Sequence, residues 1–112
     1  MTLKEKDAQD QDSALSDMQE SAAHAAAFLK ILAHEGRLMI LCHLGEGEKS
    51  VGELENLLNI RQAAVSQMLA RLRGEGLVST RREGKTIYYS LQDGNTAQMI
   101  GLLYDLFCKP QD

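Results

Sequence analysis

The 112-residue sequence contains no apolar run long enough to cross a bilayer, which argues against a membrane-spanning protein. Its first residues, MTLKEKDAQDQDSALSD, lack the apolar core of a secretory signal. We therefore predict a cytoplasmic protein that has no membrane partner. Because thiols are normally reduced in that compartment, the two cysteines, Cys42 and Cys108, are expected to be free thiols by default.

Motifs that carry enzyme chemistry are also missing. The sequence has no Cys-x-x-Cys pair at a helix start, which is the arrangement that thiol oxidoreductases favour. No nucleophile–base pair, phosphate-cradling glycine loop or carboxylate couple stands out. There is no internal repeat, and the length suits one modest core. We predict a single-domain protein that is not an enzyme and needs no cofactor, with a thiol oxidoreductase as the alternative of another class.

Positive charge is scarce overall but concentrated in one segment. The chain carries 12 Lys and Arg against 16 Asp and Glu, a net charge of −4. Residues 1–60 have 5 basic and 11 acidic side chains, residues 61–91 have 6 and 2, and residues 92–112 have 1 and 3. An acidic body with one basic face is typical of a site-selective anion binder.

The order of elements follows from hydrophobic periodicity and capping residues. Residues 1–13 are too polar to fold and are predicted to be a flexible N-terminal arm, followed by one domain over residues 14–112. Ser50 and Glu53 have capping-box spacing, and Asn59 suits a short turn. The expected helices cover residues 16–33, 35–44, 51–58, 62–74 and 95–108, and the expected strands cover residues 77–82 and 85–91 around a Glu83-Gly84 turn.

This order predicts a mainly α fold, a winged helix-turn-helix with about five helices and one β-hairpin wing. In its second DNA-binding helix, Val65, Leu69 and Leu72 are expected to be buried. The polar side chains opposite would then read base edges of double-stranded DNA, while basic ones contact phosphates. The candidate DNA-binding residues are Arg61, Gln62, Ala63, Ser66, Gln67, Arg71, Arg73, Arg81, Arg82 and Lys85.

The stretch LKILAHEGRLMILCHL, followed by SVGELENLLNIRQAAVSQMLARLRGEGLVSTRREGKTIYYSL, closely resembles the ArsR family of bacterial repressors over about residues 25–92. The resemblance implies a homodimer that forms through its first and last helices and blocks transcription at an inverted-repeat operator. The sequence departs from the family at Arg61, where a capping serine is usual, since arginine cannot cap a helix in that way. Either Asn59 or water replaces the cap, or Arg61 turns toward a phosphate.

Metal sensors of this family carry a Cys-x-Cys cluster on the helix corresponding to residues 51–58, or Asp and His pairs on the last helix. Neither pattern is present, so no metal site is predicted. A composite site of Cys42, Cys108 and His24 stays open, because thiolate and imidazole suit zinc or copper(I). The residues alone predict no more than that both cysteines are small buried hydrophobic side chains.

The positions of Cys42 and Cys108 nevertheless resemble the dithiol of one ArsR branch, the sulfur- and redox-responsive regulators of the BigR, SqrR and HlyU type. The resemblance implies that the two thiols react with persulfides, polysulfides or other oxidants and form a bridge within one subunit. Bridge formation would then release operator DNA. A metal-sensing or ligand-independent ArsR-type repressor is the alternative.

Overall fold

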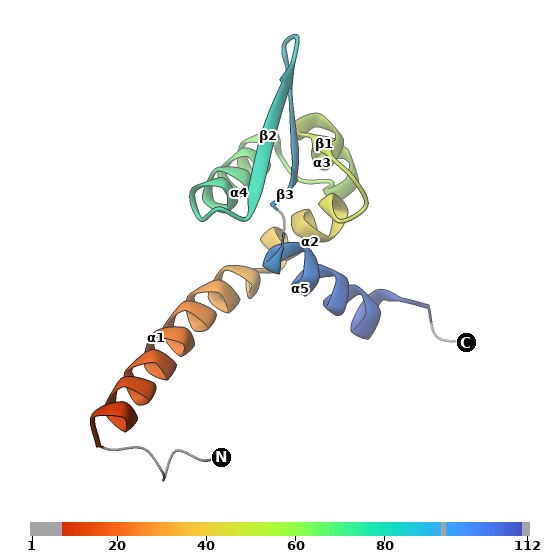
Figure 1. The fold of residues 1–112 in the computed structure, drawn as a ribbon. Helices are drawn as coiled ribbons and strands as arrows, with labels where there is room; N and C mark the ends of the chain where they lie inside the picture. Colours follow the sequence, from red (N-terminus) through yellow and green to blue (C-terminus); the bar gives the residue numbers. More distant parts are fainter. Residues whose placement is uncertain (1–7, 93, 111–112) are drawn as a thin grey trace. The chain divides into compact units, whose positions relative to one another are not determined.

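The computed structural model describes residues 8–92 and 94–110 of the chain. They fall into two compact units, one ending at Ala33 and one beginning at His34, which are described in turn. The elements, traced in Figure 1, are α1 (Ala8–Leu32), α2 (Glu35–Leu44), β1 (Lys49–Ser50), α3 (Val51–Leu58), α4 (Gln62–Gly74), β2 (Val78–Glu83), β3 (Thr86–Leu91), α5 (Asn95–Leu103) and η2 (Tyr104–Cys108). Within these described ranges, no helix combines the length and the apolarity that crossing a bilayer requires.

The first unit contains one long helix, α1, of 25 residues. It begins at Ala8 rather than at the predicted Ser16, so residues 8–13, predicted as part of the N-terminal arm, are helical. The rest of that arm, residues 1–7, lies outside the described residues. Residues 8–15 contain neither Gly nor Pro, and each added helical residue gains a backbone hydrogen bond, so the helix propagates through this polar stretch.

The second unit begins with α2, whose two ends match the prediction. His34 caps its amino end, where the imidazole Nδ1 accepts a hydrogen bond from the backbone N–H of Arg37 at 3.2 Å. Glu35 adds negative charge to the first turn, where the helix dipole favours it. The side chains that place α2 in the core are Ile40, Leu41 and Leu44.

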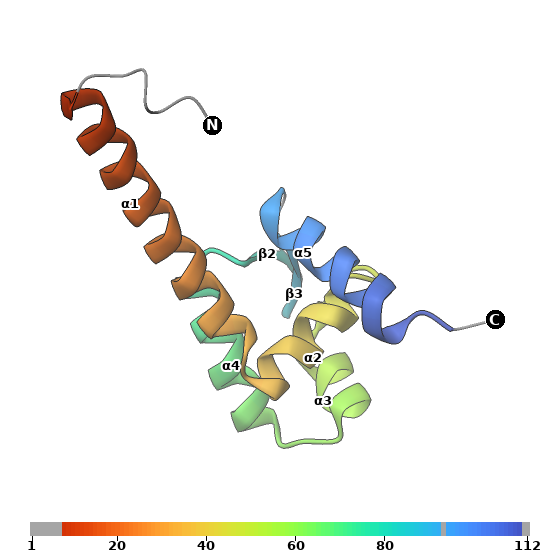
Figure 2. The same cartoon turned by 90° about the horizontal axis from the view of Figure 1, so that it is seen from below.

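Helices α3 and α4 form the predicted helix-turn-helix, whose connecting loop is visible in Figure 2. The predicted capping box is complete: the Ser50 N–H donates to the Glu53 carboxylate at 2.8 Å, and the Glu53 N–H donates to the Ser50 hydroxyl at 3.2 Å. Asn59 ends α3 in the left-handed conformation, with a φ of 55°. The predicted inner face of α4 is fully buried and consists of Val65, Leu69 and Leu72.

Helices α2 and α4 approach each other closely at Gly36. A Cβ atom at this position would lie 2.7 Å from the Met68 sulfur, which is closer than real Cβ atoms come to their neighbours. The missing side chain of Gly36 therefore lets Met68 of α4 lie directly against α2. A side chain at residue 36 would therefore require the end of the Met68 side chain to move.

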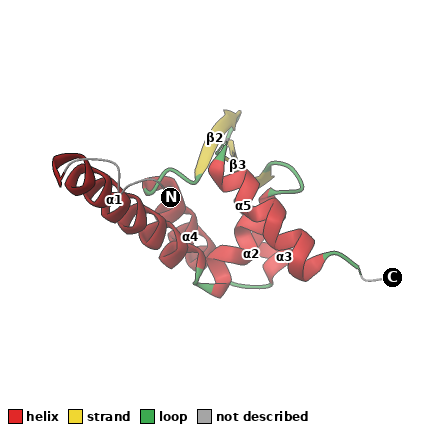
Figure 3. Ribbon diagram, turned by 60° about the horizontal axis from the view of Figure 1, so that its bottom comes forward, coloured by secondary structure: helices red, strands yellow, loops and turns green. Residues whose placement is uncertain are grey.

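The predicted wing is present as the antiparallel hairpin β2–β3, drawn in yellow in Figure 3. Glu83 pairs with Thr86, so the two-residue turn is Gly84-Lys85, one residue later than predicted. Gly84 occupies the first turn position because it adopts a positive φ of 63°, which a residue with a side chain rarely takes.

The short strand β1 was not predicted. It adds to the outer edge of β3, giving a three-stranded sheet in the order β1-β3-β2. Lys49 pairs with Tyr89 and Ser50 pairs with Tyr88. The segment that follows α2 is thereby attached to the wing.

The last helix runs over residues 95–108, as predicted, but its final five residues form a π-helical turn, η2. The N–H of Lys109 bonds to the carbonyl of Tyr104 at 2.8 Å, which is the wider hydrogen-bond spacing of that helix type. Thr96 and Ile100 are buried. The large side chains of this last helix that are exposed in the single chain are Leu102, Tyr104, Leu106 and Phe107.

The capping box yields a stability prediction. Ser50→Ala removes the acceptor for the Glu53 N–H and should lower the free energy of unfolding by about 1 kcal/mol. Ser66→Ala is the matched control, because Ser66 is exposed inside α4, where alanine is the better helix former. Urea unfolding followed by circular dichroism measures both. Equal denaturation midpoints for the two variants would contradict the role of the cap.

Candidate nucleic-acid interface and thiol pocket

The outward face of α4 carries the predicted polar residues. Gln62, Ala63, Ser66 and Gln67 are all exposed at or near its amino end, opposite the buried apolar face. These four side chains combine amide and hydroxyl groups with one methyl, the groups that can meet base edges in a major groove. Nothing in the described residues covers them, so the face is open to a partner.

Arg61 occupies the cap position of α4 and makes no side-chain capping hydrogen bond, as predicted from its chemistry. Its backbone is extended, with φ and ψ of −65° and 146°, and its side chain is exposed. The first N–H groups of a helix lack intrahelical partners, and uncapped ones can bind an anion. Arg61 therefore places a cation beside a helix end that itself favours negative charge.

The two arginines of the wing differ in their surroundings. Arg81 is held by Glu48: its Nε donates to one carboxylate oxygen at 3.2 Å, and an Nη donates to the other. A second carboxylate, that of Glu83, lies 3.6 Å from Arg81, and the ring of Tyr88 lies beneath the guanidinium at 4.8 Å. Neighbouring Arg82 is exposed and forms no ion pair with any residue described.

Pairing divides the predicted basic residues into two groups. Arg71 is paired with Glu75 at 3.3 Å, and Arg81 is paired with Glu48. The guanidinium of Arg81 also holds the pKa of the Glu48 carboxyl below its usual range. Sequence reasoning missed Glu48 because its partner lies 33 positions away, and Glu48 precedes the strand β1, which was not predicted. The candidate DNA-binding residues that carry positive charge and form no ion pair in the described ranges are Arg61, Arg73, Arg82 and Lys85.

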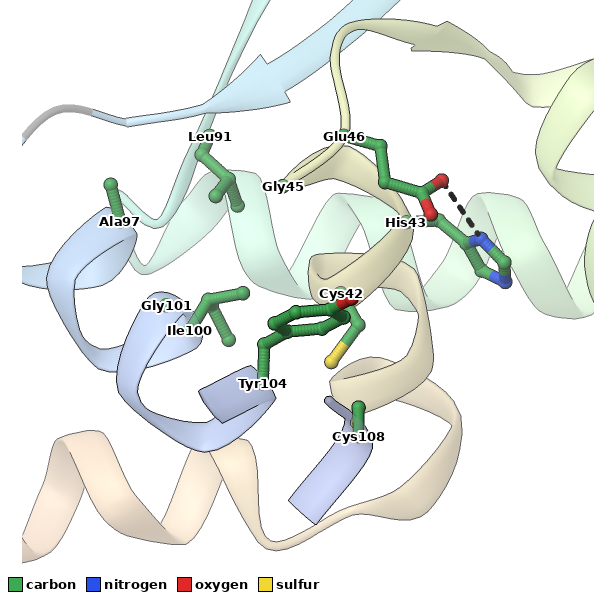
Figure 4. A pocket seen from close by; sticks show the side chains of 10 residues that line it. All are labelled: Cys42, His43, Gly45, Glu46, Leu91, Ala97, Ile100, Gly101, Tyr104 and Cys108. Carbon is green, nitrogen blue, oxygen red and sulfur yellow. Dashed lines mark ion pairs between the residues drawn. The ribbon is translucent and has the colours of Figure 1, made fainter. Parts of the chain in front are cut away.

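The two cysteines line one pocket of about 450 Å³ (Figure 4). Cys42 lies on α2 and Cys108 is the last residue of η2. In Figure 4 the sulfur of Cys42 points toward the end of the last helix, where Cys108 lies. The structure thus brings together two thiols that are 66 positions apart. The other lining residues are His43, Gly45, Glu46, Leu91, Ala97, Ile100, Gly101 and Tyr104.

The two thiols differ in accessibility. Cys42 is half-buried, whereas Cys108 is exposed, and both are free. Burial raises the pKa of the Cys42 thiol, and the nearby Cys108 and Glu46 raise it further. The thiolate is the nucleophile, so Cys42 is less reactive at neutral pH than a typical exposed cysteine. Expecting both cysteines to be buried was wrong for Cys108, since the helix end that carries it is exposed.

Two side chains beside Cys42 carry ionisable groups. His43 Nδ1 lies 3.8 Å from the Glu46 carboxylate, at the carboxyl end of α2 (Figure 4). Among the residues that the structure describes, no three His, Cys, Asp or Glu side chains gather as a metal site.

A helix-turn-helix with an exposed polar second helix, followed by a basic hairpin, defines a winged helix-turn-helix, a class of DNA-binding domain. Residues 34–80 match the family model described as bacterial regulatory protein, arsR family. Together with the relatives below, this match shows that the chain belongs to the ArsR family and is a transcriptional regulator rather than an enzyme.

The relatives cover most of the chain. It is 49% identical over 98 residues to the biofilm growth-associated repressor of Agrobacterium fabrum, covering 88% of this chain and 84% of that protein. It is 46% identical over 95 residues to the transcriptional activator HlyU of Vibrio cholerae, covering 85% and 88%. The solved structure of reduced HlyU from Vibrio cholerae matches with a TM-score of 0.80 at 46% identity, covering 83% of this chain and 98% of that one.

The environment of Cys42 predicts its pH–reactivity profile. Its alkylation by uncharged iodoacetamide should rise at a higher pH than that of an ordinary cysteine, because a raised pKa delays thiolate formation. In Cys108→Ser the rise should move to lower pH, since one neighbouring charge is removed. Mass spectrometry of the Cys42 peptide gives the rate, and Glu55→Gln, outside the pocket, is the control. An unshifted profile in Cys108→Ser would contradict the proximity of the two thiols.

Proposed function

We propose that this chain is a homodimeric repressor that binds an inverted-repeat operator and releases it when Cys42 and Cys108 become bridged within one subunit. The observation that carries the proposal is the shared pocket, in which α2 and η2 present both thiols to the same space. Persulfides and polysulfides are the proposed inducers. One related structure is that of reduced HlyU, which is consistent with a protein whose thiol state matters.

DNA reading is proposed to use the outward face of α4 and the unpaired cations. Gln62, Ser66 and Gln67 would meet base edges, with Ala63 against a thymine methyl group. Arg61, Arg73, Arg82 and Lys85 would contact phosphates, because no carboxylate in the described part of the chain pairs with them. Arg71 and Arg81 would contribute less, since each already has a carboxylate partner.

Dimer formation is proposed through the first and last helices. Phe107 is 79% exposed and Leu106 is 59% exposed in the single chain, which is costly in water. On α1, Ala22, Ala25, Ala26 and Leu29 form an exposed stripe of small and apolar side chains. A second copy would bury these surfaces. A two-fold dimer of this kind places two recognition helices about 34–36 Å apart, one helical turn of DNA.

The proposed switch is an ordinary thiol exchange. The exposed Cys108 thiolate attacks the sulfane sulfur of a persulfide RSSH, and RS⁻ leaves with the electron pair and takes up a proton. Cys42 then attacks the protein sulfur of the resulting Cys108 persulfide, and HS⁻ leaves. The net reaction converts two thiols and RSSH into a disulfide, RSH and H₂S. Two electrons pass from the protein thiols to the persulfide.

Helix α2 connects this reaction to DNA binding. It carries Cys42, and it also contacts α4 through Gly36 and Met68. A covalent bridge fixes the spacing of α2 and η2, so dimer arrangements that need another spacing lose population. A coupling free energy of about 1–3 kcal/mol would lower operator affinity roughly five- to 150-fold.

The contact assignment predicts two kinds of variant. Gln62→Ala should change sequence preference, since a base contact discriminates by about 1–3 kcal/mol. Arg82→Ala should weaken binding to operator and scrambled DNA alike and reduce the salt slope by about 1, whereas Arg81→Ala should reduce it less. Binding isotherms at several salt concentrations measure all three. Equal slopes for Arg81→Ala and Arg82→Ala would contradict the assignment of Arg82.

The switch predicts the behaviour of single-thiol variants. Cys42→Ser and Cys108→Ser should each fold, dimerise and bind operator as the parent does, yet stay bound when an organic persulfide is added. In the parent, intact mass should show loss of two hydrogens within one subunit as affinity falls. Operator titrations and mass spectra of the same samples test this. Release of Cys108→Ser by persulfide, or a bridge between subunits, would rule the proposal out.

If persulfide leaves the operator affinity of the parent unchanged, the chain is instead a ligand-independent regulator of the same family. Release of operator by zinc or copper(I), without oxidation, would instead support a metal sensor. Both results are read in the same DNA titration, which makes it the most informative single experiment.

A further inference from the structure

The thiol pocket has a one-sided charge distribution. Among the residues that the structure describes, Glu46 is the only carboxylate that lines the pocket, and no lysine or arginine lines it. The Glu46 carboxylate is close enough to Cys42 to raise the pKa of that thiol, as does Cys108 from the other side. A reagent that enters the pocket therefore meets a fixed negative charge and, once a thiolate has formed, a second one.

The remaining walls offer nothing that would offset this charge. Leu91, Ala97 and Ile100 contribute aliphatic carbon, and Tyr104 contributes an aromatic ring, as Figure 4 shows. His43 is the one lining side chain that can become cationic, and it lies 3.8 Å from Glu46. Only a protonated imidazole would cancel the carboxylate. An imidazole is ordinarily neutral above about pH 7.

We propose that Glu46 is a specificity-determining residue that excludes anionic oxidants from Cys42 and so favours uncharged sulfur donors. The class favoured is an uncharged organic persulfide, disulfide or polysulfide whose carbon or sulfur chain contacts the apolar wall. This inference rests on the proposed thiol switch, in which Cys42 reacts with the Cys108 persulfide, since it names the external reagents that can reach Cys42 directly. Glu46 takes no part in bond formation.

Two effects of Glu46 on Cys42 must be separated. Its charge raises the pKa of the thiol, which slows attack on every electrophile by reducing the thiolate fraction. Its charge also repels incoming anions, which slows attack on charged electrophiles alone. The ratio of the rate constants for an anionic and an uncharged reagent isolates the second effect, because the thiolate fraction is the same in both reactions and cancels.

The experiment uses Cys108→Ser protein, in which Cys42 is the only thiol, and the probes 5,5′-dithiobis(2-nitrobenzoate) and 4,4′-dithiodipyridine. In both reactions the Cys42 thiolate attacks one sulfur of the probe, a mixed disulfide forms, and one aromatic thiolate leaves. The first probe carries two negative charges and the second carries none at about pH 8, where an imidazole is ordinarily neutral. Release of the aromatic thiol gives each rate constant.

Glu46→Gln should raise the ratio of the anionic-probe rate to the uncharged-probe rate by about three- to tenfold at low ionic strength, and salt should diminish the gain. Glu48→Gln is the matched control, because it removes a carboxylate two positions along that is paired with Arg81 and does not line the pocket. It should leave the ratio unchanged.

An unchanged ratio in Glu46→Gln would overturn the proposal, and so would an equal rise in Glu48→Gln. A rise of both rate constants by the same factor would mean that Glu46 acts through the thiol pKa alone, which also overturns it. Operator release is measured separately on protein with both cysteines. Charge selection without operator release would refute the proposed switch while leaving the role of Glu46 intact.

Discussion

Close packing of α2 against α4 is the interaction on which the rest of the second unit depends. At Gly36 the Met68 side chain of α4 lies directly against α2, in the space that a side chain at residue 36 would take. The apolar face of α4 is fully buried there, so its polar face is presented outward. Because closely packed helices shift together rather than deform, the recognition surface has the rigidity that reading base edges requires.

The same helix α2 serves both candidate sites. One side contacts α4, Cys42 lines the thiol pocket, and the segment beyond its carboxyl end leads through Glu48 and β1 to the wing. A change in the position of α2 would therefore reach both α4 and the wing, the two elements proposed to contact DNA. The proposed thiol switch would act through this shared helix.

Local chemistry made most of this fold predictable from the sequence. The ends of α2 and α4, the capping box at Ser50 and the left-handed Asn59 depend on residues within a few positions of each other. What could not be predicted depends on distant partners. The strand β1 exists only because β3 pairs with it, and the Arg81–Glu48 ion pair follows from that pairing.

The candidate sites divide in the same way. Exposure of the polar face of α4 follows from helical periodicity, so the residues proposed to read bases could be listed from the sequence. The sequence could not show which arginines are already paired with a carboxylate, because counting charges does not reveal which side chains lie together. The prediction that Cys42 and Cys108 lie close together came from the resemblance to a family and not from their spacing in the sequence. The start of α1 was misplaced because polar composition was weighed above the absence of a helix breaker.

The π-helical end of the last helix means that the direction of a thiol is set by a backbone hydrogen bond. The amide of Lys109 bonds to the Tyr104 carbonyl; in a continuous α-helix its acceptor would be Asp105. Moving that hydrogen bond by one carbonyl would rewind the final turn and carry Cys108 around the helix axis by up to about 100°, the angle of one residue step. The position of Cys108 at the pocket thus depends on this hydrogen-bond register, which a single-residue insertion or deletion in η2 would change while leaving α5 in place.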